Sequence, residues 1–501
     1  MKYIEKLKKN IDISKWTKIL YAITAILFAM PSIIYLCENR TVLHFNNYFN
    51  FLLNNMDKLD QTLIYIIVLV LLTIIYFGII KNREKIFKNI KEVYIYVAII
   101  ASIFVLVIPF TSSDIFYYLG IGRIDSKYNQ NPYYVTIKQF VDKNNAVNDG
   151  NGTNNVDLEK DTVLAKGYEN VWSDTTVVYG PVWTLMCRFI SGITFGNIDI
   201  ALLVFKIFNL LAHILSCYLI YKITNKKIFA IIYGVNPFVL IEGIANVHND
   251  IYMITLVLSS IYFLKNKKNI LLSVIFLALA TAIKYFTILI LPFVVIYYFR
   301  NEKPTDRLKK CILYGGIFTV IIGITYLLYV RDISVLNGML TQQEKVAKNF
   351  YVILSEYFCN IEGIIPKVNK LLLGAFVIIY FFKCVTLLFK KKIKFRKEMQ
   401  VVNYFLLAFI FLLITNFQIW YLMWIFPLIP WQNALQVKNI VQISLISQFA
   451  NSVFFLNGEG WKNGTPFTFA FIVGILSMII VNEKMQNNKK VKAFSKKINK
   501  V

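Results

Sequence analysis

Polar or aromatic residues that could take part in chemistry lie at the ends of apolar segments in three places along this chain. The first is Asp114, where the apolar run 105–110 gives way to a long polar loop. A carboxylate at the mouth of a transmembrane segment can act as a base on a substrate that arrives from the lipid. Because charged groups are costly at a membrane, each one is a functional candidate. A carboxylate that only caps a helix end is the alternative interpretation of Asp114.

Aromatic residues and one arginine follow Asp114. They include Tyr117, Arg123 and the run Asn131-Pro132-Tyr133. A sugar hydroxyl could transfer its proton to Asp114 while Arg123 holds an anion such as a lipid phosphate. An interfacial aromatic belt with a snorkelling arginine is the simpler interpretation. That interpretation accounts for the tyrosines but not for Asp114.

The second candidate segment begins at Asn236-Pro237 and ends at His248-Asn249-Asp250, with Glu242 between them. Its polar groups could bind hydroxyls, a phosphate or a proton. Because Glu242 precedes His248 by six residues, the two need not share a helix face. The spacing matches no strong zinc pattern, so a metal site is not expected here.

The third candidate segment is Phe417 to Pro427, which contains Gln418, Trp420 and Tyr421. Aromatic residues are common at membrane interfaces without any function, so this segment alone is weak evidence. Lys284 lies in an otherwise apolar turn and could pair with a phosphate. It could equally extend its ammonium group to the surface.

Membrane-spanning helices must position these residues. The chain has 501 residues, of which 57% are hydrophobic and 16% aromatic, and its mean hydropathy is +0.57. Runs of about 20 apolar residues recur, and each is long enough to cross a bilayer as a helix. Backbone groups in lipid must be paired within the chain, which favours helices. We therefore expect an all-α polytopic bundle of about 13 or 14 spans in one membrane domain, residues 1–501.

The net charge of +26 indicates membrane topology rather than a nucleic-acid partner. Basic clusters occupy short segments between the apolar runs, and the positive-inside rule places them in the cytoplasm. They include the N-terminus and the tail 484–501, so both termini of this plasma-membrane protein are expected to be cytoplasmic. The loop 112–176 has nine acidic and six basic residues and is expected to be external. The segment 331–370 is the second expected external loop.

The topology between residues 179 and 223 is left open by the sequence. The apolar runs 179–195 and 200–223 cannot both cross the membrane without placing Lys222 outside. One of them is therefore expected to be re-entrant, or a further short helix lies between them.

The six cysteines are scattered with no CxxC spacing, so neither a disulfide framework nor structural zinc is expected.

The three segments together resemble the GT-C class of polytopic glycosyltransferases, and within it the bacterial polyprenol-phosphate-mannose-dependent mannosyltransferases. The resemblance covers most of the chain in order. The similar elements are Asp114, Asn131-Pro132-Tyr133, Tyr179-Gly180-Pro181-Val182-Trp183, Asn236-Pro237 with Glu242 and His248-Asn249-Asp250, and Trp420-Tyr421-Leu422-Met423-Trp424. The chain departs from the family at Ile419, where relatives often have proline. It also carries a long polar insertion, 142–174, which leaves acceptor recognition open.

The resemblance implies transfer of a hexose, mannose or glucose, from a polyprenyl-phosphate carrier to an envelope glycan, lipid or protein at the outer face. Asp114 would be the general base, and the reaction would invert the anomeric carbon. The implied substrate-binding residues are Arg123, Tyr117, Asn131, Tyr179, Glu242, His248, Asn249, Asp250, Lys284, Gln418, Trp420 and Tyr421. We expect no metal and no separate cofactor, because the lipid-linked sugar is a co-substrate. The chain has no nucleotide-binding glycine loop, which agrees with a lipid-linked donor.

Two other functions are compatible with a polytopic chain. A transporter or flippase of lipid-linked sugars would favour polar residues at mid-membrane depth and two similar halves. The sequence shows no clear symmetry between halves, and the candidate residues gather toward one face. An envelope-glycan polymerase or ligase would also be polytopic with an external catalytic loop, and fold class does not separate it from a transferase.

Overall fold

The chain is helical throughout the part that the computed structural model describes, residues 13–43, 58–146, 156–344, 365–414 and 417–450. No strand occurs in these ranges, which confirms the expected all-α class. Among the described residues, five helices are long and apolar enough to cross a membrane, so the protein is a multi-pass membrane protein. They are α2 (Ile13–Asn39), α3 (Lys58–Ile86), α9 (Ile198–Thr224), α15 (Pro304–Tyr326) and α18 (Ile365–Phe389). The expected total of about 13 or 14 crossings stays a prediction, because shorter apolar helices accompany these five.

The helices belong to two compact units. The first unit takes in the described parts of 1–111, 206–247 and 441–478, and the second those of 112–205 and 248–440. Besides α2 and α3, the first unit contains α4 (Ile90–Val105), α10 (Lys227–Gly234), α11 (Pro237–Leu240) and the π-helical turn η1 (Ile241–Ala245). Helix α9 begins in the second unit and ends in the first, and α20 (Ala434–Ala450) does the same.

Pro237 breaks an apolar helix in the first unit, where α10 meets the α11–η1 segment at a bend of 53°. A proline supplies no N–H, so the last carbonyls of α10 lack helical donors, which is costly in lipid. Three buried side chains of other helices donate to these carbonyls instead. They are Tyr76 to Ile232 (3.0 Å), His213 to Gly234 (2.9 Å between the ring nitrogen and the oxygen) and Tyr21 to Val235 (2.6 Å).

A buried polar cluster follows the bend. The amide of Asn246 accepts from the backbone N–H of Phe110 (3.1 Å) and donates to Glu242 (3.1 Å). Gln448 donates to the other oxygen of Glu242 at 2.6 Å. Lys206 donates to the backbone carbonyls of Val107, Ile244 and Ala245. These contacts join the chain before Asp114 to the chain before His248.

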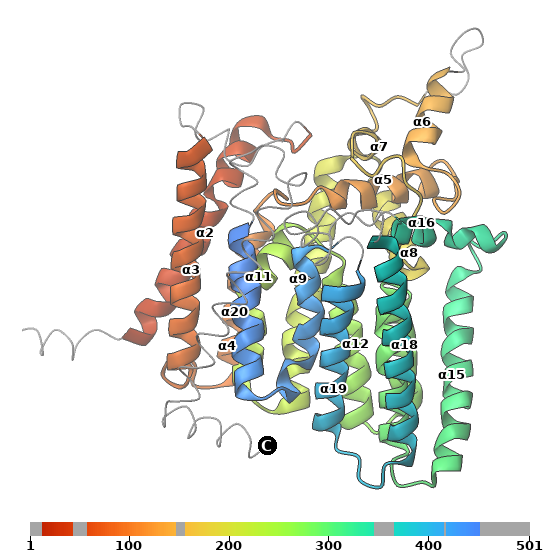
Figure 1. The fold of residues 1–501 in the computed structure, drawn as a ribbon. Coiled ribbons are helices and arrows are strands. Elements are labelled where there is room, and N and C mark those ends of the chain that lie inside the picture. The colour runs from red at the N-terminus through yellow and green to blue at the C-terminus, as the bar shows by residue number, and fades with distance from the viewer. Residues whose placement is uncertain (1–12, 44–57, 147–155, 345–364, 415–416, 451–501) are drawn as a thin grey trace, which may run out of the picture. The chain divides into compact units, whose positions relative to one another are not determined.

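The second unit contains the remaining helices, besides α15 and α18. Those before residue 249 are α5 (Asp114–Ser126), α6 (Ile137–Ala146), α7 (Thr162–Tyr168) and α8 (Pro181–Ile193). Those after it are α12 (Asp250–Lys265), α13 (Ile270–Thr281), η2 (Tyr285–Ile290), α14 (Leu291–Tyr298), η3 (Ile333–Leu336), α16 (Asn337–Glu344), α19 (Phe395–Ala408), η5 (Phe409–Leu413) and the 3₁₀ helix η6 (Ile419–Trp431). Figure 1 shows α5, α6 and α7 gathered at one end of α15 and α18.

The two apolar runs around residues 179–223 form helices of unequal length. Helix α8 has 13 residues and rises about 20 Å, which is shorter than the hydrocarbon core. Helix α9 has 27 residues and is long enough to cross. Helix α8 is thus the shorter of the two, and the expectation that one of the two runs is re-entrant stays a prediction. The orientation of the termini also stays a prediction, and the tail 484–501 and residues 345–364 of the second expected external loop lie outside the described residues.

Candidate active site

Asp114 is the first residue of α5, so its carboxylate lies at the positive end of a helix. Its side chain is 14% exposed. The hydroxyl of Tyr118, one turn along α5, donates to Asp114 Oδ2 at 3.4 Å, and the hydroxyl of Tyr179 lies 3.0 Å from that of Tyr118. Asp114 therefore ends a chain of two tyrosine hydroxyls while keeping access to solvent.

His248 is buried beside Asp114. Its Nδ1 lies 4.0 Å from Asp114 Oδ2, and its ring stacks on Trp420 with 4.0 Å between centroids and 19° between planes. The indole of Trp420 thus fixes the imidazole plane. The structure brings together three residues that lie far apart in the sequence, and each was singled out from it.

Lys284 supplies a buried positive charge. Its ammonium donates to Asp250 Oδ1 at 2.7 Å, with the lysine 8% exposed and the aspartate fully buried. Trp424 Nε1 donates to the same carboxylate oxygen. The rings of Tyr179, Tyr421 and Trp424 surround the ammonium, with centroids 5.8, 5.0 and 5.2 Å away. Such an aromatic cage stabilises a cation while leaving it close to a ligand.

The backbone at Gly180 explains why Tyr179 and Lys284 meet. The N–H of Val182 donates to Ala282 O at 3.0 Å, so the start of α8 runs against the end of α13. A Cβ on Gly180 would lie 2.2 Å from that same carbonyl oxygen. Only glycine permits this approach. Pro181 then begins α8 at a position where its missing N–H costs nothing.

The substitution Gly180→Ala is therefore expected to destabilise the second unit by about 1–3 kcal/mol and to reduce activity, because the added methyl group must displace backbone. The matched control is Gly315→Ala in α15, where nothing lies within 4 Å of the added Cβ. That change should leave the midpoint of thermal unfolding unchanged or raised. Unfolding followed by tryptophan fluorescence measures both, and equal midpoints for the two variants would contradict the argument.

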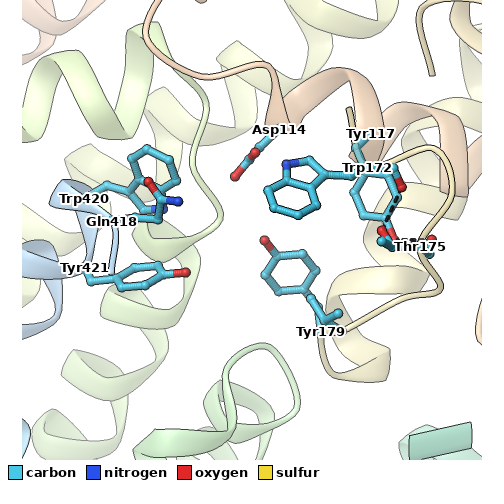
Figure 2. Close-up of a pocket in the computed structure, with 9 residues that line it drawn as sticks. Asp114, Tyr117, Trp172, Thr175, Tyr179, Gln418, Trp420 and Tyr421 are labelled. Atoms are coloured by element: carbon cyan, nitrogen blue, oxygen red, sulfur yellow. Dashed lines mark hydrogen bonds between the residues drawn. The ribbon is translucent and has the colours of Figure 1, made fainter. Parts of the chain in front are cut away.

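A pocket that is partly open to solvent lies at these residues. The lining residues are Asp114, Tyr117, Trp172, Thr175, Val178, Tyr179, Gln418, Trp420 and Tyr421. In Figure 2, Gln418, Trp420 and Tyr421 form one wall, and Tyr117, Trp172 and Thr175 form the wall opposite. Asp114 and Tyr179 lie between the walls, and their oxygens point into the space that the walls enclose.

The tyrosine hydroxyls near Asp114 are hydrogen-bond donors at neutral pH. Burial raises the pKa of the Tyr117 hydroxyl. It also raises the pKa values of the Tyr118 and Tyr179 hydroxyls well above the usual value for tyrosine. Nearby carboxylates, Asp114 among them, act in the same direction. Tyr118 therefore stays protonated and donates to the Asp114 carboxylate.

Two residues predicted to bind substrate have other partners. The guanidinium Nε of Arg123 donates to both oxygens of Asp161, at 3.1 and 2.8 Å, in a buried ion pair. Lys127 and Tyr128 bond to the same aspartate. The amide of Asn131 donates to the backbone carbonyl of Tyr329 at 2.7 Å. Neither Arg123 nor Asn131 lines the pocket, so their part in substrate binding stays a prediction.

The other polar residues predicted in the second segment, Glu242, Asn249 and Asp250, differ in surroundings. Glu242 belongs to the first unit, where Asn246 and Gln448 bond to it. Asn249 is fully buried, and no atom of its amide has a hydrogen-bond partner among the described residues. One oxygen of Asp250 is likewise unpaired there. Buried polar groups without partners are rare, and an active site is one of the places where they occur.

The sequence did not single out several residues of the site. Trp172, Thr175 and Val178 line the pocket but lie in or next to the polar insertion. Tyr118 and Trp424 contact Asp114 and Asp250 although only their neighbours were selected. A tryptophan in a polar loop was an available signal for Trp172, because such a ring is rarely placed in solvent without use. Within the part of the chain described, no three His, Cys, Asp or Glu residues are grouped to hold a metal ion.

Comparison with known proteins gives one match. The family described as alpha-(1->6)-mannopyranosyltransferase, N-terminal domain, matches residues 20–300, more than half of the chain. The matched range includes Asp114, His248, Asp250 and Lys284, whereas the aromatic wall of η6 lies beyond it. Neither the curated proteins nor the solved structures give a significant match.

Proposed function

Since this chain belongs to the alpha-(1->6)-mannopyranosyltransferase family and is a membrane-bound mannosyltransferase, we propose that its pocket takes mannose from a polyprenyl-phosphate carrier. The acceptor is an envelope glycan, lipid or protein at the outer face. The observation that carries the proposal is the arrangement of Asp114 and Lys284 about one aromatic pocket, a base and a cation with Tyr179 between them. A displacement at a sugar phosphate needs these two charges.

Asp114 is the proposed general base. A hydroxyl oxygen of the acceptor forms a bond to C1 of the mannose while the bond from C1 to the phosphate oxygen breaks. The hydroxyl proton passes to Asp114 Oδ, and the electron pair of the broken bond leaves with the polyprenyl phosphate. Tyr118 and the nearby His248 orient the carboxylate. Positioning of the two substrates supplies a large part of the rate enhancement in addition to the base.

Lys284 is the proposed partner of the leaving phosphate. Its ammonium is held by Asp250 beside Tyr179 and Tyr421, both of which line the pocket. A fixed cation that is shielded from water stabilises charge as it develops on the phosphate oxygens. Asn249, with its unpaired buried amide, is a proposed ligand of the donor. The donor is a co-substrate, and we propose no separate cofactor.

The linkage in the family description adds a constraint on the donor. A single displacement inverts the configuration at C1, so an α-linked product requires a β-linked mannosyl phosphate. We therefore propose that the carrier holds mannose in the β configuration. The cytoplasmic placement expected for the basic clusters supports a site on the opposite face, where a carrier lipid can deliver the sugar.

Transfer assays in liposomes test the proposal. The purified protein is given radiolabelled polyprenyl-phosphate mannose, polyprenyl-phosphate glucose or GDP-mannose, with octyl α-D-mannopyranoside as acceptor. We expect labelled product from the polyprenyl-phosphate mannose and an α linkage by NMR. Transfer from GDP-mannose alone would contradict the lipid-linked donor, and a β-linked product would contradict inversion from a β-linked donor.

A further inference from the structure

One wall of the pocket has no part in the chemistry described above. Trp420 and Tyr421 lie on the side of Lys284, to which the leaving phosphate is assigned. Trp172 and Thr175 lie on the opposite side, as Figure 2 shows, with Asp114 between the two walls. An attacking hydroxyl must approach C1 from the side opposite the leaving phosphate. The wall with Trp172 is therefore placed to receive the acceptor.

Asn170 joins the turn that carries Trp172 to the start of α5. Its side-chain N–H donates to the backbone carbonyl of Ser113 at 2.7 Å, and its side-chain oxygen accepts the N–H of Trp172 at 3.0 Å. Asn170 is 7% exposed. Because Ser113 is the residue before Asp114, one buried side chain sets the separation between the indole and the catalytic carboxylate.

Further bonds hold the same turn. The hydroxyl of Tyr117 donates to the carbonyl of Thr175 at 3.2 Å, and the N–H of Thr175 donates to the carbonyl of Trp172 at 2.9 Å. The N–H of Lys138 donates to the carbonyl of Ser173 at 2.9 Å. The turn is thus tied to α5 and α6 although it lies in a polar loop. Such fixation is expected of a binding surface, since an ordered platform costs little entropy when a ligand binds.

The exposed surface of Trp172 has the chemistry of a sugar platform. The indole is half-buried, and it stacks on no other aromatic ring in the part of the chain described. Its flat apolar face can pack against the C–H face of a pyranose ring, while nearby tyrosine hydroxyls and Asp114 meet the sugar hydroxyls. An acyl chain in this position would leave those polar groups without partners.

We infer, on the basis of the proposed function, that Trp172 is the platform of an acceptor-sugar subsite and that Asn170 is the residue that positions it against Asp114. The subsite takes the terminal pyranose of the acceptor by stacking on the indole. The sugar hydroxyl that attacks then points to Asp114. The external insertion thus selects the acceptor, whereas η6 and Lys284 hold the donor.

Steady-state kinetics with two substrates tests the inference. The probes are radiolabelled polyprenyl-phosphate mannose and octyl α-D-mannopyranoside, and KM is measured for each. We expect Trp172→Ala to raise the acceptor KM about tenfold, the effect of one lost ring contact, with the donor KM unchanged. Trp172→Phe should recover much of the loss because it restores a flat ring. The matched control is Val171→Ala, since Val171 is the neighbouring residue and is 75% exposed.

Asn170→Asp tests the positioning role separately. The aspartate oxygen can still accept the N–H of Trp172 but has no N–H for the Ser113 carbonyl. We expect the acceptor KM to rise as in Trp172→Ala, and we expect the double substitution to add little, because both changes remove one function. Purely additive effects would contradict the coupling between Asn170 and Trp172.

The outcomes separate this inference from the proposed function. Wild-type transfer with an unchanged acceptor KM in Trp172→Ala overturns the subsite and leaves the transferase assignment intact. Equal changes in the KM of donor and acceptor overturn it as well, because they indicate general damage to the pocket. A wild-type protein that transfers from no mannosyl donor overturns the proposed function and the subsite with it.

Discussion

Replacing Asp114 with asparagine is expected to lower kcat/KM for mannose transfer by about 10²–10⁴-fold, the contribution of a positioned general base. Asparagine has nearly the same shape and can still accept the hydroxyl of Tyr118, which lies 3.4 Å from the carboxylate. It cannot take the proton of an acceptor hydroxyl. Initial rates with labelled polyprenyl-phosphate mannose measure the loss, and the midpoint of thermal unfolding should stay at the wild-type value.

Asp157→Asn is the matched control for this prediction. Asp157 is an exposed acid in the same segment, residues 112–176, and it accepts the backbone N–H groups of Glu159 and Lys160 at 3.1 Å. An asparagine oxygen can accept both bonds, so the rate and the folding should be unchanged. Wild-type transfer by Asp114→Asn would exclude Asp114 as the base. If His248→Gln then abolished transfer, the base would be His248, which is 4.0 Å away.

Three residues that meet at the candidate site could be selected from the sequence because each breaks an apolar pattern. Asp114, His248 and Trp420 lie at the polar ends of hydrophobic runs, and the cost of polar groups at a membrane marks such positions. The same cost predicts the helical class, since backbone groups in lipid must pair within the chain. Hydropathy does not report which ends meet. That Trp420 stacks on His248 depends on packing between segments about 170 residues apart.

Two contacts of the candidate site depend on partners far apart in the sequence. Arg123 has the charge to bind a phosphate, but Asp161, 38 positions later, holds its guanidinium. Nothing in the spacing of the two residues indicates that pair. Trp172 reaches the pocket because Asn170 anchors its turn to Ser113, 57 positions earlier. Sequence periodicity predicts which face of a helix or strand is buried. A single hydrogen bond between residues far apart in the chain, such as that from Asn170 to Ser113, leaves no periodic pattern.

Two glycines also show that a residue's type does not reveal its long-range contacts. Gly180 permits the approach of α8 to the end of α13, and this contact brings Tyr179 beside Lys284. Gly315 lies in a helix where an added Cβ would meet nothing. The two residues are identical in type and differ only in what surrounds them. A single sequence therefore cannot show which glycine the site requires.

Substitution in the ion pair of Lys284 with Asp250 gives the second large expected effect, because this pair is expected to support both the stability of the protein and the transfer reaction. Lys284→Met removes the cation and leaves the buried carboxylate of Asp250 without its charged partner. Breaking a buried ion pair on one side costs about 3–5 kcal/mol. We expect the midpoint of thermal unfolding in detergent to fall sharply and transfer to be lost.

The double variant Lys284→Met with Asp250→Asn separates the two effects. A neutral amide can still accept from Trp424 Nε1, so no uncompensated charge stays buried, and most of the lost stability should return. Transfer should stay lost, since nothing replaces the cation beside Tyr179 and Tyr421. Thermal unfolding and transfer rates are measured on the same preparations.

Lys160→Met is the control for removal of a lysine. Its ion pair with Asp157 is on the surface, so both the unfolding midpoint and the rate should be unchanged. Transfer that recovered together with stability in the double variant would show that Lys284 supports the fold alone. If stability recovers in the double variant but transfer does not, the Lys284 ammonium acts on the leaving phosphate. The single and double variants would then have different stabilities and share only the missing ammonium. The single variant thus measures what the buried ion pair contributes to stability, and the double variant measures what the Lys284 charge contributes to transfer.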